Sequence, residues 1–271
     1  MFRLLTIIVG VGMLVFKAQA LTLELDGPLT QGALIRGKAD PGTRIWLDGT
    51  PVKVSRDGHF VLGFGRDAAL NHVVKARSGE GSEISRALTL KKREYKIQRI
   101  TGVAKKYVSP PPETLARIRD DNRRVREARA HFTDRLDFLG PFVSPAEGPI
   151  SGVYGSQRFF NGEPRRPHYG LDIAAPVGAP VKAVAGGIVR LADPDLYFSG
   201  GTIIIDHGYG VNTSYLHLSE VLVKAGDEVR AGQLIGRVGK TGRVTGAHLD
   251  WRLNWFQERL DPALVVPVRD K

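Results

Sequence analysis

The sequence predicts a mainly β protein with a small N-terminal β-sandwich-like domain, a helical connector and a C-terminal antiparallel-sheet domain. Short apolar segments rich in β-branched and aromatic residues recur on both sides of the connector, and Gly-containing turns separate them. One helical pattern lies between the two sets of segments. We expect a signal peptide over residues 1–20, an accessory β domain over 21–92, a basic linker and helix over 93–140, and the larger domain over 141–271.

The first residues have the pattern of an export signal. Arg3 supplies positive charge, Leu4 to Phe16 is an apolar run, and Ala18-Gln19-Ala20 is a small-x-small cleavage site. The run is too short to span a bilayer comfortably, so we expect cleavage and no stable transmembrane segment afterwards. An uncleaved anchor or a buried core segment is the alternative. Because the sequence has no cysteine, we expect neither a lipoprotein anchor nor disulfides.

The composition is that of a folded protein with a basic surface. The sequence is 42% hydrophobic and 25% charged, with a formal net charge of +11 at pH 7. Such a charge favours a polyanionic partner, namely nucleic acid, anionic lipid or an anionic wall polymer. We expect no nucleic-acid partner, because the chain is predicted to be exported and lacks an aromatic-basic RNA-binding signature. Solubility alone is the alternative explanation of the charge.

Residues 21–92 contain six short segments with strand-like composition at sandwich-like spacing. No group of reactive residues accompanies them. His59 and His72 stand alone in the sequence, and we interpret both as structural. A binding or spacer role is therefore expected for this part. The predicted strands are residues 21–25, 33–35, 44–47, 52–54, 60–62 and 73–76.

The connector begins with a basic linker, residues 93–112, which ends in a run of prolines. A helix with one apolar seam is expected next, because apolar and small residues recur at three- and four-residue steps. The opposite face carries six arginines. A solvated face is the default interpretation, and a surface for an anionic polymer is the alternative. The seam comprises Leu115, Ile118, Asn122, Val125, Ala128 and Phe132.

From residue 141 onward, glycine is frequent and the apolar stretches have strand length. This pattern predicts a mostly antiparallel β domain without a helix of normal length. The predicted strands are residues 181–184, 187–189, 202–205, 211–216 and 234–238.

Within this domain, His168 and Asp172 form the first candidate pair of functional residues. In an extended segment, residues i and i+4 point to the same face, and Gly170 between them can relax the backbone so that the side chains converge. One divalent cation could then take a nitrogen from the imidazole and an oxygen from the carboxylate. A surface pair or a loop hydrogen bond is the more ordinary explanation of this spacing.

Two later segments add candidates. Tyr215 and His217 are expected on one strand face, and His248 and Asp250, at i and i+2, on another. Combined with the first pair, these residues offer three metal ligands and two proton-transfer groups. Zinc accepts imidazole nitrogen and carboxylate oxygen, and it lowers the pKa of a bound water to about 7. Histidine is the natural general acid and base at that pH.

Residues 148–265 resemble the catalytic domain of the lysostaphin-type zinc endopeptidases, which cut peptidoglycan peptides. The order and spacing of the matching stretches cover nearly the whole domain. The stretches are His168-Tyr169-Gly170-Leu171-Asp172 with the following residues to Val181, Ile205-Asp206-His207-Gly208, Tyr215-Leu216-His217-Leu218-Ser219, Val223 to Val229, and Gly239 to Asp250.

The resemblance implies an open groove of antiparallel sheet with one Zn²⁺ on its floor. It assigns His168 and Asp172 as zinc ligands and His217 and His248 as catalytic residues. The family's third ligand is the second histidine of a His-x-His motif, and Asp250 stands at that position. We expect Asp250 to be the third ligand. Two carboxylates would donate more charge than one, so the bound water should be less acidic than in the usual site.

Two functions are therefore considered. The first is a zinc-dependent endopeptidase of the periplasm or cell envelope that hydrolyses peptide cross-links or stem peptides of peptidoglycan. The alternative is a catalytically degenerate envelope protein that binds peptidoglycan or activates another cell-wall hydrolase. The presence of His217 and His248 favours the enzyme. Other envelope proteins are further candidate partners, the connector helix could act as an inhibitory arm, and His207 is expected to take no part in the chemistry.

Overall fold

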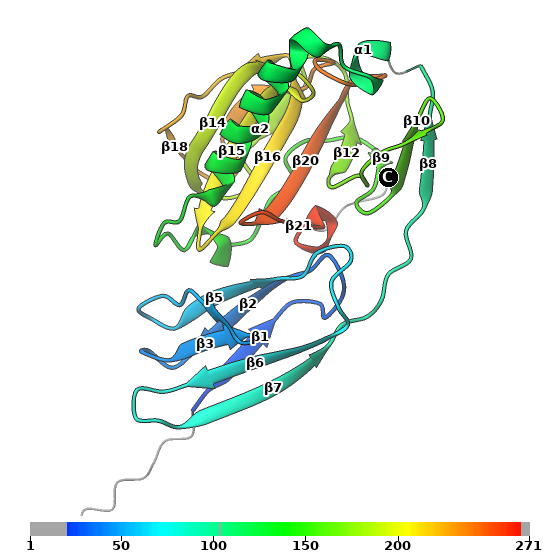
Figure 1. Cartoon of the computed structure of the whole chain (residues 1–271). Helices are drawn as coiled ribbons and strands as arrows, with labels where there is room; N and C mark the ends of the chain where they lie inside the picture. Colours follow the sequence, from blue (N-terminus) through cyan, green and yellow to red (C-terminus); the bar gives the residue numbers. More distant parts are fainter. Residues whose placement is uncertain (1–20, 103, 267–271) are drawn as a thin grey trace, which may run out of the picture.

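The computed structural model describes residues 21–102 and 104–266, and it is mainly β, as the sequence predicts (Figure 1). The leader predicted over residues 1–20 lies outside the described residues. Among the helices that are described, none combines the length and the apolar character needed to cross a bilayer.

The N-terminal part consists of two packed sheets. One sheet has the order β1-β2-β5 and the other has the order β4-β3-β6-β7. Ile35 and Phe60 of the first sheet pack with Ile45 and Val74 of the second, which gives the sandwich core. The sequence pattern does not reveal β7, because Leu88 is its one fully buried residue. The strands are β1 (Leu23–Asp26), β2 (Leu34–Ala39), β3 (Arg44–Leu47), β4 (Thr50–Val52), β5 (His59–Gly63), β6 (Asn71–Arg77) and β7 (Glu83–Thr89).

The connector contains more regular structure than a linker and one helix. Strand β8 (Ile97–Ile100) pairs in parallel with β10 (Gln157–Phe160), which also pairs with β11 (Glu163–Pro164). Two helices follow, α1 (Lys105–Val108) and α2 (Leu115–Ala130). Part of the expected linker is thus a sheet strand, held by backbone hydrogen bonds that composition alone does not indicate.

Helix α2 buries a shorter seam than its sequence pattern predicts. Ala128 is buried and packs with Leu191 and Ile204. Leu115 is 40% exposed and Phe132, beyond the end of the helix, is 39% exposed. The predicted basic face is partly used within the chain, because Arg117 and Arg124 pair with acidic residues of β14 (Gly187–Leu196). Three short 3-10 helices are also described, Pro112–Thr114, Asp137–Leu139 and Pro262–Leu264.

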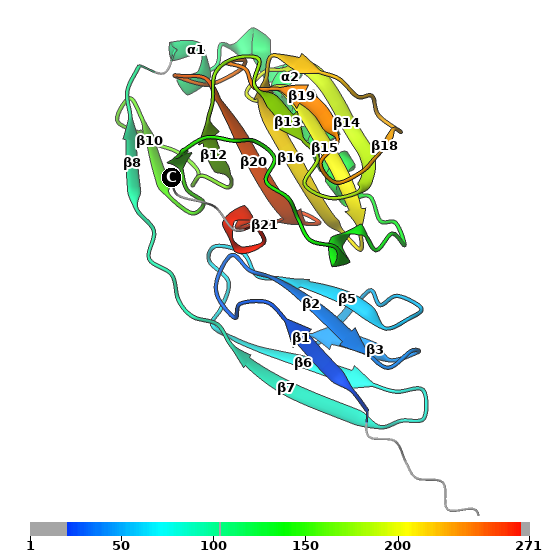
Figure 2. The same cartoon turned by 180° about the vertical axis from the view of Figure 1, so that it is seen from behind.

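The C-terminal part is built on a large, antiparallel sheet with the order β18-β14-β15-β16-β20-β12-β9, and β21 pairs with β20. A smaller sheet, β13-β19-β17, packs behind it (Figure 2). The main hydrophobic core lies between the two layers. The strands are β9 (Ile150–Gly152), β12 (Leu171–Ala174), β13 (Pro180–Lys182), β15 (Gly200–Gly208), β16 (Val211–Leu218), β17 (Glu220–Val221), β18 (Glu228–Val229), β19 (Leu234–Arg237), β20 (His248–Trp255) and β21 (Glu258–Leu260).

Helix α2 lies across β14 and β15 on the outer face of the large sheet (Figure 1). Ile204, Ser214 and Arg252 stand opposite one another on β15, β16 and β20, so their side chains share a face. Ile204 contacts the helix, and the Arg129 side chain of the helix donates a hydrogen bond to Ser214 Oγ. The helix therefore lies on the same face as Arg252 and its neighbours on β20.

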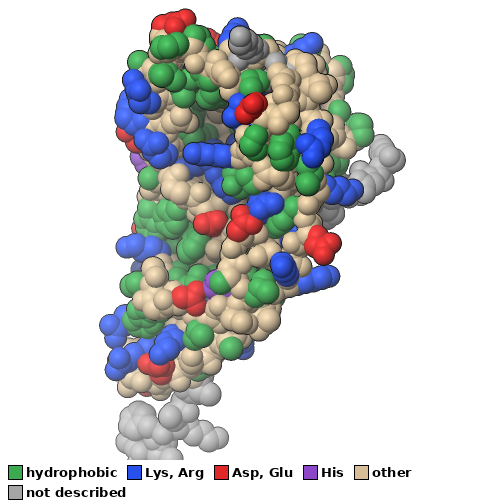
Figure 3. Space-filling view, turned by 45° about the vertical axis from the view of Figure 1, so that its right-hand side comes forward, with side chains coloured by type: hydrophobic (Ala, Val, Ile, Leu, Met, Phe, Trp, Pro, Cys, Tyr) green, Lys and Arg blue, Asp and Glu red, His purple; other side chains and the backbone are tan. Residues whose placement is uncertain are grey.

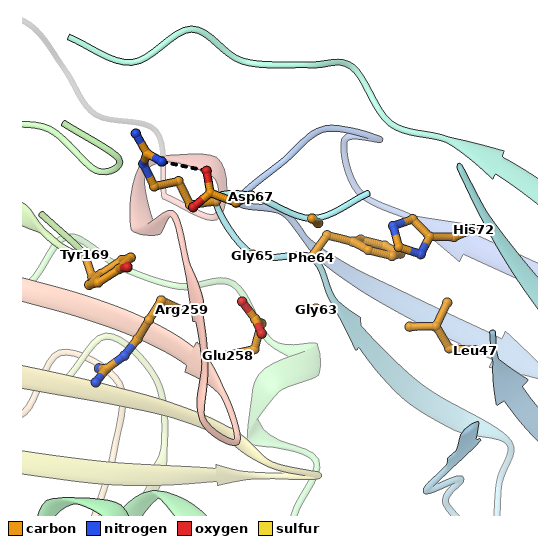
Figure 4. Close-up of a pocket in the computed structure, with 11 residues that line it drawn as sticks. Leu47, Gly63, Phe64, Gly65, Asp67, His72, Tyr169, Glu258 and Arg259 are labelled. Atoms are coloured by element: carbon orange, nitrogen blue, oxygen red, sulfur yellow. Dashed lines mark hydrogen bonds and ion pairs between the residues drawn. The ribbon is translucent and has the colours of Figure 1, made fainter. Parts of the chain in front are cut away.

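The two halves of the chain are joined by polar contacts. Arg36 donates a hydrogen bond to the Phe138 carbonyl at 2.7 Å, and Arg93 pairs with Asp261 at 2.7 Å. A cavity of about 410 Å³ lies at this junction. Figure 4 shows Tyr169 and Arg259 on one side of it and His72 on the other. The cavity is lined by none of the five predicted metal-binding and catalytic residues.

Candidate active site

The candidate site is built where strands β12 and β20 pair. Asp172 stands directly opposite Asp250 in the ladder, so both carboxylates project from the same face of the sheet. His168 precedes β12, and its Nε2 lies 2.9 Å from Asp172 Oδ1. One potential ligand atom from each of the three residues lies within 4.8 Å of the others, and all three side chains are buried.

The unsatisfied atoms of this cluster indicate that it suits a cation. His168 Nε2 and Asp172 Oδ1 are buried and lie 2.9 Å apart, but they are not aligned as a hydrogen bond, and neither has another hydrogen-bond partner among the described residues. Buried polar atoms without partners are costly, and a shared cation would satisfy both atoms. One imidazole and two carboxylates are a donor set that zinc accepts. His168, Asp172 and Asp250 therefore fit the predicted metal in residue type, convergence and unmet bonding capacity.

Each carboxylate also has an arginine partner. Arg158 Nη2 donates to Asp172 Oδ2 at 2.6 Å, while Arg252 Nε and Nη2 donate to the two oxygens of Asp250 at 2.9 and 2.6 Å. Burial alone would raise the pKa of Asp250, but Arg252 and His168 outweigh it and hold that pKa well below its usual value. The pKa of Asp172 is also lowered, because His168 and Arg158 outweigh the effects of burial and of Asp250.

Neither arginine was singled out from the sequence. Arg252 follows Asp250 by two residues, so strand alternation could have placed it on the same face. Arg158 lies on β10, distant in sequence from its partner, and no local pattern points to it.

Two glycines make room for the carboxylates. A Cβ atom on Gly170 would lie 2.2 Å from Asp250 Oδ1, and one on Gly152 would lie 2.2 Å from Asp172 Oδ2. Gly170 is not among the described residues with positive φ. Its role is therefore to leave space beside Asp250, rather than to adopt the relaxed backbone that the sequence suggested.

His217 reaches the site through an unusual backbone conformation. Leu216 stands opposite Asp250 on β20, so strict alternation would turn residues 215 and 217 to the other face. Tyr215 does face the core, where its hydroxyl accepts a hydrogen bond from the Val184 N–H at 3.0 Å. His217 instead has φ of 68°, and its Nε2 lies 4.0 Å from Asp250 Oδ2. The prediction that Tyr215 and His217 share a face is therefore wrong, because a local irregularity overrides the period of the strand.

His217 and His248 lie side by side, with ring centroids 5.0 Å apart. His217 Nδ1 donates to the Thr241 carbonyl at 2.9 Å, and His248 Nδ1 donates to the Gly246 carbonyl at 3.0 Å. In the neutral form of an imidazole bonded in this way, the Nε2 atom carries no proton. His248 Nε2 lies 3.9 Å from Asp172 Oδ1. Burial lowers the pKa of His217 to about 4.

The other histidines singled out from the sequence have ordinary structural partners. His207 is buried and bonds to the Gly186 carbonyl and to Thr213 Oγ1. His59 is bonded to Lys38, and the His72 ring pairs with Asp48 at 2.6 Å. None of the three belongs to the cluster of potential metal ligands found among the described residues.

Comparison with known proteins identifies the domain that carries this site. The family model "Peptidase family M23" matches residues 166–262, a range that includes all five candidate residues. Peptidoglycan DD-endopeptidase ShyA of Vibrio cholerae is 47% identical over 87 residues, which cover 32% of this chain and 20% of ShyA. The chain thus spans about a fifth of the length of this relative.

Two solved structures extend the comparison. A Pseudomonas aeruginosa protein described as a peptidase M23 has a TM-score of 0.65 and 28% sequence identity. The match covers 88% of this chain and 94% of the Pseudomonas chain. The catalytic domain of lysostaphin from Staphylococcus simulans is 34% identical and covers 41% of this chain and 77% of its own, with a TM-score of 0.32. The family match confirms the resemblance seen in the sequence: residues 166–262 of this chain form a domain of peptidase family M23.

Proposed function

We propose that the protein is a zinc-dependent endopeptidase that hydrolyses peptide bonds in peptidoglycan. The observation that carries this proposal is the convergence of three potential ligands, His168, Asp172 and Asp250, beside the two histidines His217 and His248. Membership of a metallopeptidase family and the name of the ShyA relative support the substrate class.

The three ligands would hold the zinc, and the two histidines would handle protons. Zinc bound there would polarise the scissile carbonyl and lower the pKa of a water molecule beside it. His217 is neutral at pH 7, because burial lowers its pKa to about 4, and its unprotonated Nε2 is aimed at the ligand cluster. It is therefore suited to accept the proton of the attacking water.

His248 lies beside His217 and complements it. Its Nε2 is directed towards Asp172, and the bond from Nδ1 to the Gly246 carbonyl fixes its ring. In the protonated form, this imidazole could donate a hydrogen bond to the developing oxyanion or a proton to the departing amine. Hydrolysis would then break the C–N bond: the water oxygen stays on the carbonyl carbon, the departing amine gains one proton from a histidine, and the proton that His217 took from water balances the one given up.

One observation favours the alternative of a non-catalytic envelope protein. Arg158 and Arg252 already neutralise Asp172 and Asp250, so the two carboxylates have cationic partners without a metal. A domain of this kind would bind peptidoglycan without cutting it. The enzyme remains the better-supported function, because His217 and His248, which binding alone would not require, lie beside the three potential ligands.

The proposed substrate also fits the predicted location. Peptidoglycan lies outside the cytoplasmic membrane, so the proposed activity requires export, for which the leader predicted over residues 1–20 provides a route. We therefore place the protein in the periplasm or cell envelope.

Digestion of purified peptidoglycan tests the proposed function. We expect the protein with zinc to release shortened or uncrosslinked peptides, identified by mass, and a chelator to stop the release. His217→Ala should be inactive, whereas His59→Ala, which removes a histidine from the N-terminal part, should retain activity. Failure to release peptides with any divalent metal, together with retention of the protein on the wall material, would support the binding alternative.

A further inference from the structure

Arg243 lies in an unusual setting beside the candidate site. It belongs to the loop between β19 and β20, and its backbone N–H donates to the Phe198 carbonyl at 2.8 Å. Its guanidinium lies over two aromatic rings, 4.7 Å from the centroid of Phe198 and 4.8 Å from that of Phe160. The two rings hold the planar cation in place and leave its N–H groups available along the edge.

The loop connects this cation directly to the catalytic histidines. Two residues before Arg243, the Thr241 carbonyl accepts the hydrogen bond from His217 Nδ1. Five residues after it, the loop ends at His248, the first residue of β20. The Arg243 side chain is therefore carried by the same short segment that positions both histidines.

Arg243 is also a cation without an anionic partner among the described residues. The charges that act on it come from the site itself, since Arg252, Arg158 and Arg165 lower its pKa and Asp250 raises it. Burial has the largest effect, and the pKa falls to about 10, so the group stays charged at neutral pH.

Four arginines lie in or beside the site, and two of them form ion pairs with carboxylates. The four are Arg158, Arg165, Arg243 and Arg252. Arg158 pairs with Asp172 and Arg252 pairs with Asp250. The Arg165 guanidinium bonds to the Val108 carbonyl, which carries no charge. The site thus has an excess of positive charge, and a dication would add to it. Basic side chains also predominate over acidic ones on the face shown in Figure 3.

We infer that Arg243 binds a free carboxylate of the substrate, close to the scissile amide. A half-buried guanidinium with no protein anion is suited to a carboxylate, which it can bind through two parallel hydrogen bonds. This inference rests on the proposed function and narrows it, because substrates with that carboxylate would be preferred over otherwise identical amidated ones.

A purely structural role for Arg243 is the competing explanation, and two substitutions separate the roles. Arg243→Met keeps an unbranched apolar side chain between Phe160 and Phe198 but removes the charge. Arg243→Lys keeps the charge but loses the planar fork. If Arg243 only packs between the two rings, methionine should largely preserve its role. If Arg243 binds a carboxylate, binding should be lost with methionine and partly retained with lysine.

The test compares one cross-linked muropeptide in two forms, with free carboxylates and with the carboxylates converted to primary amides. For the wild type, we expect amidation to raise KM about ten- to a hundredfold, with little change in kcat. Arg243→Met should have the same high KM for both forms, and Arg243→Lys should recover part of the preference. Arg99→Gln is the matched control, because Arg99 stacks on Phe159 at 4.7 Å but is not among the charges that act on Arg243.

The inference would be overturned if the wild type had equal KM values for the two forms. It would also be overturned if Arg243→Met preferred the free-carboxylate form over the amidated form as strongly as the wild type does. Binding measured by calorimetry to the His217→Ala protein separates this result from failure of the proposed function. If no form is hydrolysed but the acid still binds more tightly than the amide in an Arg243-dependent way, the proposed activity fails and the carboxylate site stands.

Discussion

Arg252 holds Asp250 with two hydrogen bonds, from Nε to Oδ1 at 2.9 Å and from Nη2 to Oδ2 at 2.6 Å. The carboxylate and the guanidinium together carry no net charge. The family resemblance places a histidine at position 250, and its neutral imidazole also carries no net charge. Asp250 and Arg252 therefore replace that histidine as a pair. The extra negative charge expected from an aspartate at this position is largely offset by its neighbour.

This pairing predicts that restoring the family's histidine alone damages the metal site. In Asp250→His, Arg252 loses its carboxylate and faces an imidazole and a dication. We expect zinc affinity, measured by competition with a chelator, to fall about tenfold or more because like charges then repel. Adding Arg252→Met should recover most of the loss. Zinc binding by Asp250→His as tight as that of the wild type would show that the two positions are independent.

The two catalytic histidines should be separable from the metal ligands. His217→Ala and His248→Ala are each expected to lower the rate of peptide release about 10²- to 10⁴-fold, because each removes a proton-transfer group. Zinc content should stay at the wild-type level, since neither residue belongs to the three-ligand cluster. Retained cleavage in either variant would contradict its role, and loss of zinc would reclassify that histidine as a ligand.

The lowered pKa of His217 predicts a pH dependence of stability. Between pH 6.5 and about 4, the unfolded chain binds a proton at this residue that the folded chain does not. The free energy of unfolding should therefore decrease as the pH falls through that range, by up to about 1.4 kcal/mol per pH unit from this group.

Urea unfolding of the metal-free protein at several pH values measures this effect. His217→Gln should show a weaker dependence between pH 6.5 and 4. The lowered pKa values of Asp172 and Asp250 act at lower pH, because a lowered carboxyl pKa contributes stability that is lost only as the pH falls from 3.8 towards the folded value. An identical slope in the variant and the wild type would contradict the burial of a neutral imidazole.

Space beside Asp250 should be as important as the ligand itself. Gly170→Ala would place a Cβ 2.2 Å from Asp250 Oδ1 and 2.8 Å from Arg252 Cγ. We expect it to destabilise the protein by about 1–3 kcal/mol and to weaken zinc binding. Gly79→Ala is the control, because a Cβ there meets no atom within 4 Å. Normal zinc affinity in Gly170→Ala would show that the carboxylate moves without consequence.

Much of the fold was predictable because the strands of this chain have clear compositional signals. The segments around residues 44–47 and 202–205 are short, apolar and β-branched, and both are strands. Strand β8 gave no such signal, because its stability comes from parallel pairing with β10 rather than from burial of its own side chains. Backbone pairing of this kind depends on which segments meet in space.

The candidate site was partly predictable for a similar reason. Asp172 and Asp250 come together through strand pairing, and their residue types alone suggested a cation. Arg158 could not be predicted, because β10 brings it from a different strand and sheet. Strand periodicity also could not predict the face to which the His217 side chain points, because that direction depends on a positive φ at a non-glycine residue.

Metal analysis of the purified protein tests the central claim most directly. After dialysis against zinc and removal of excess metal, we expect one zinc ion per chain in the wild type and in Gly79→Ala. Asp250→Ala should retain far less, because it removes one of three ligands. A wild-type protein without zinc, or an Asp250→Ala protein that keeps a full equivalent, would contradict the assignment of Asp250 as the third ligand.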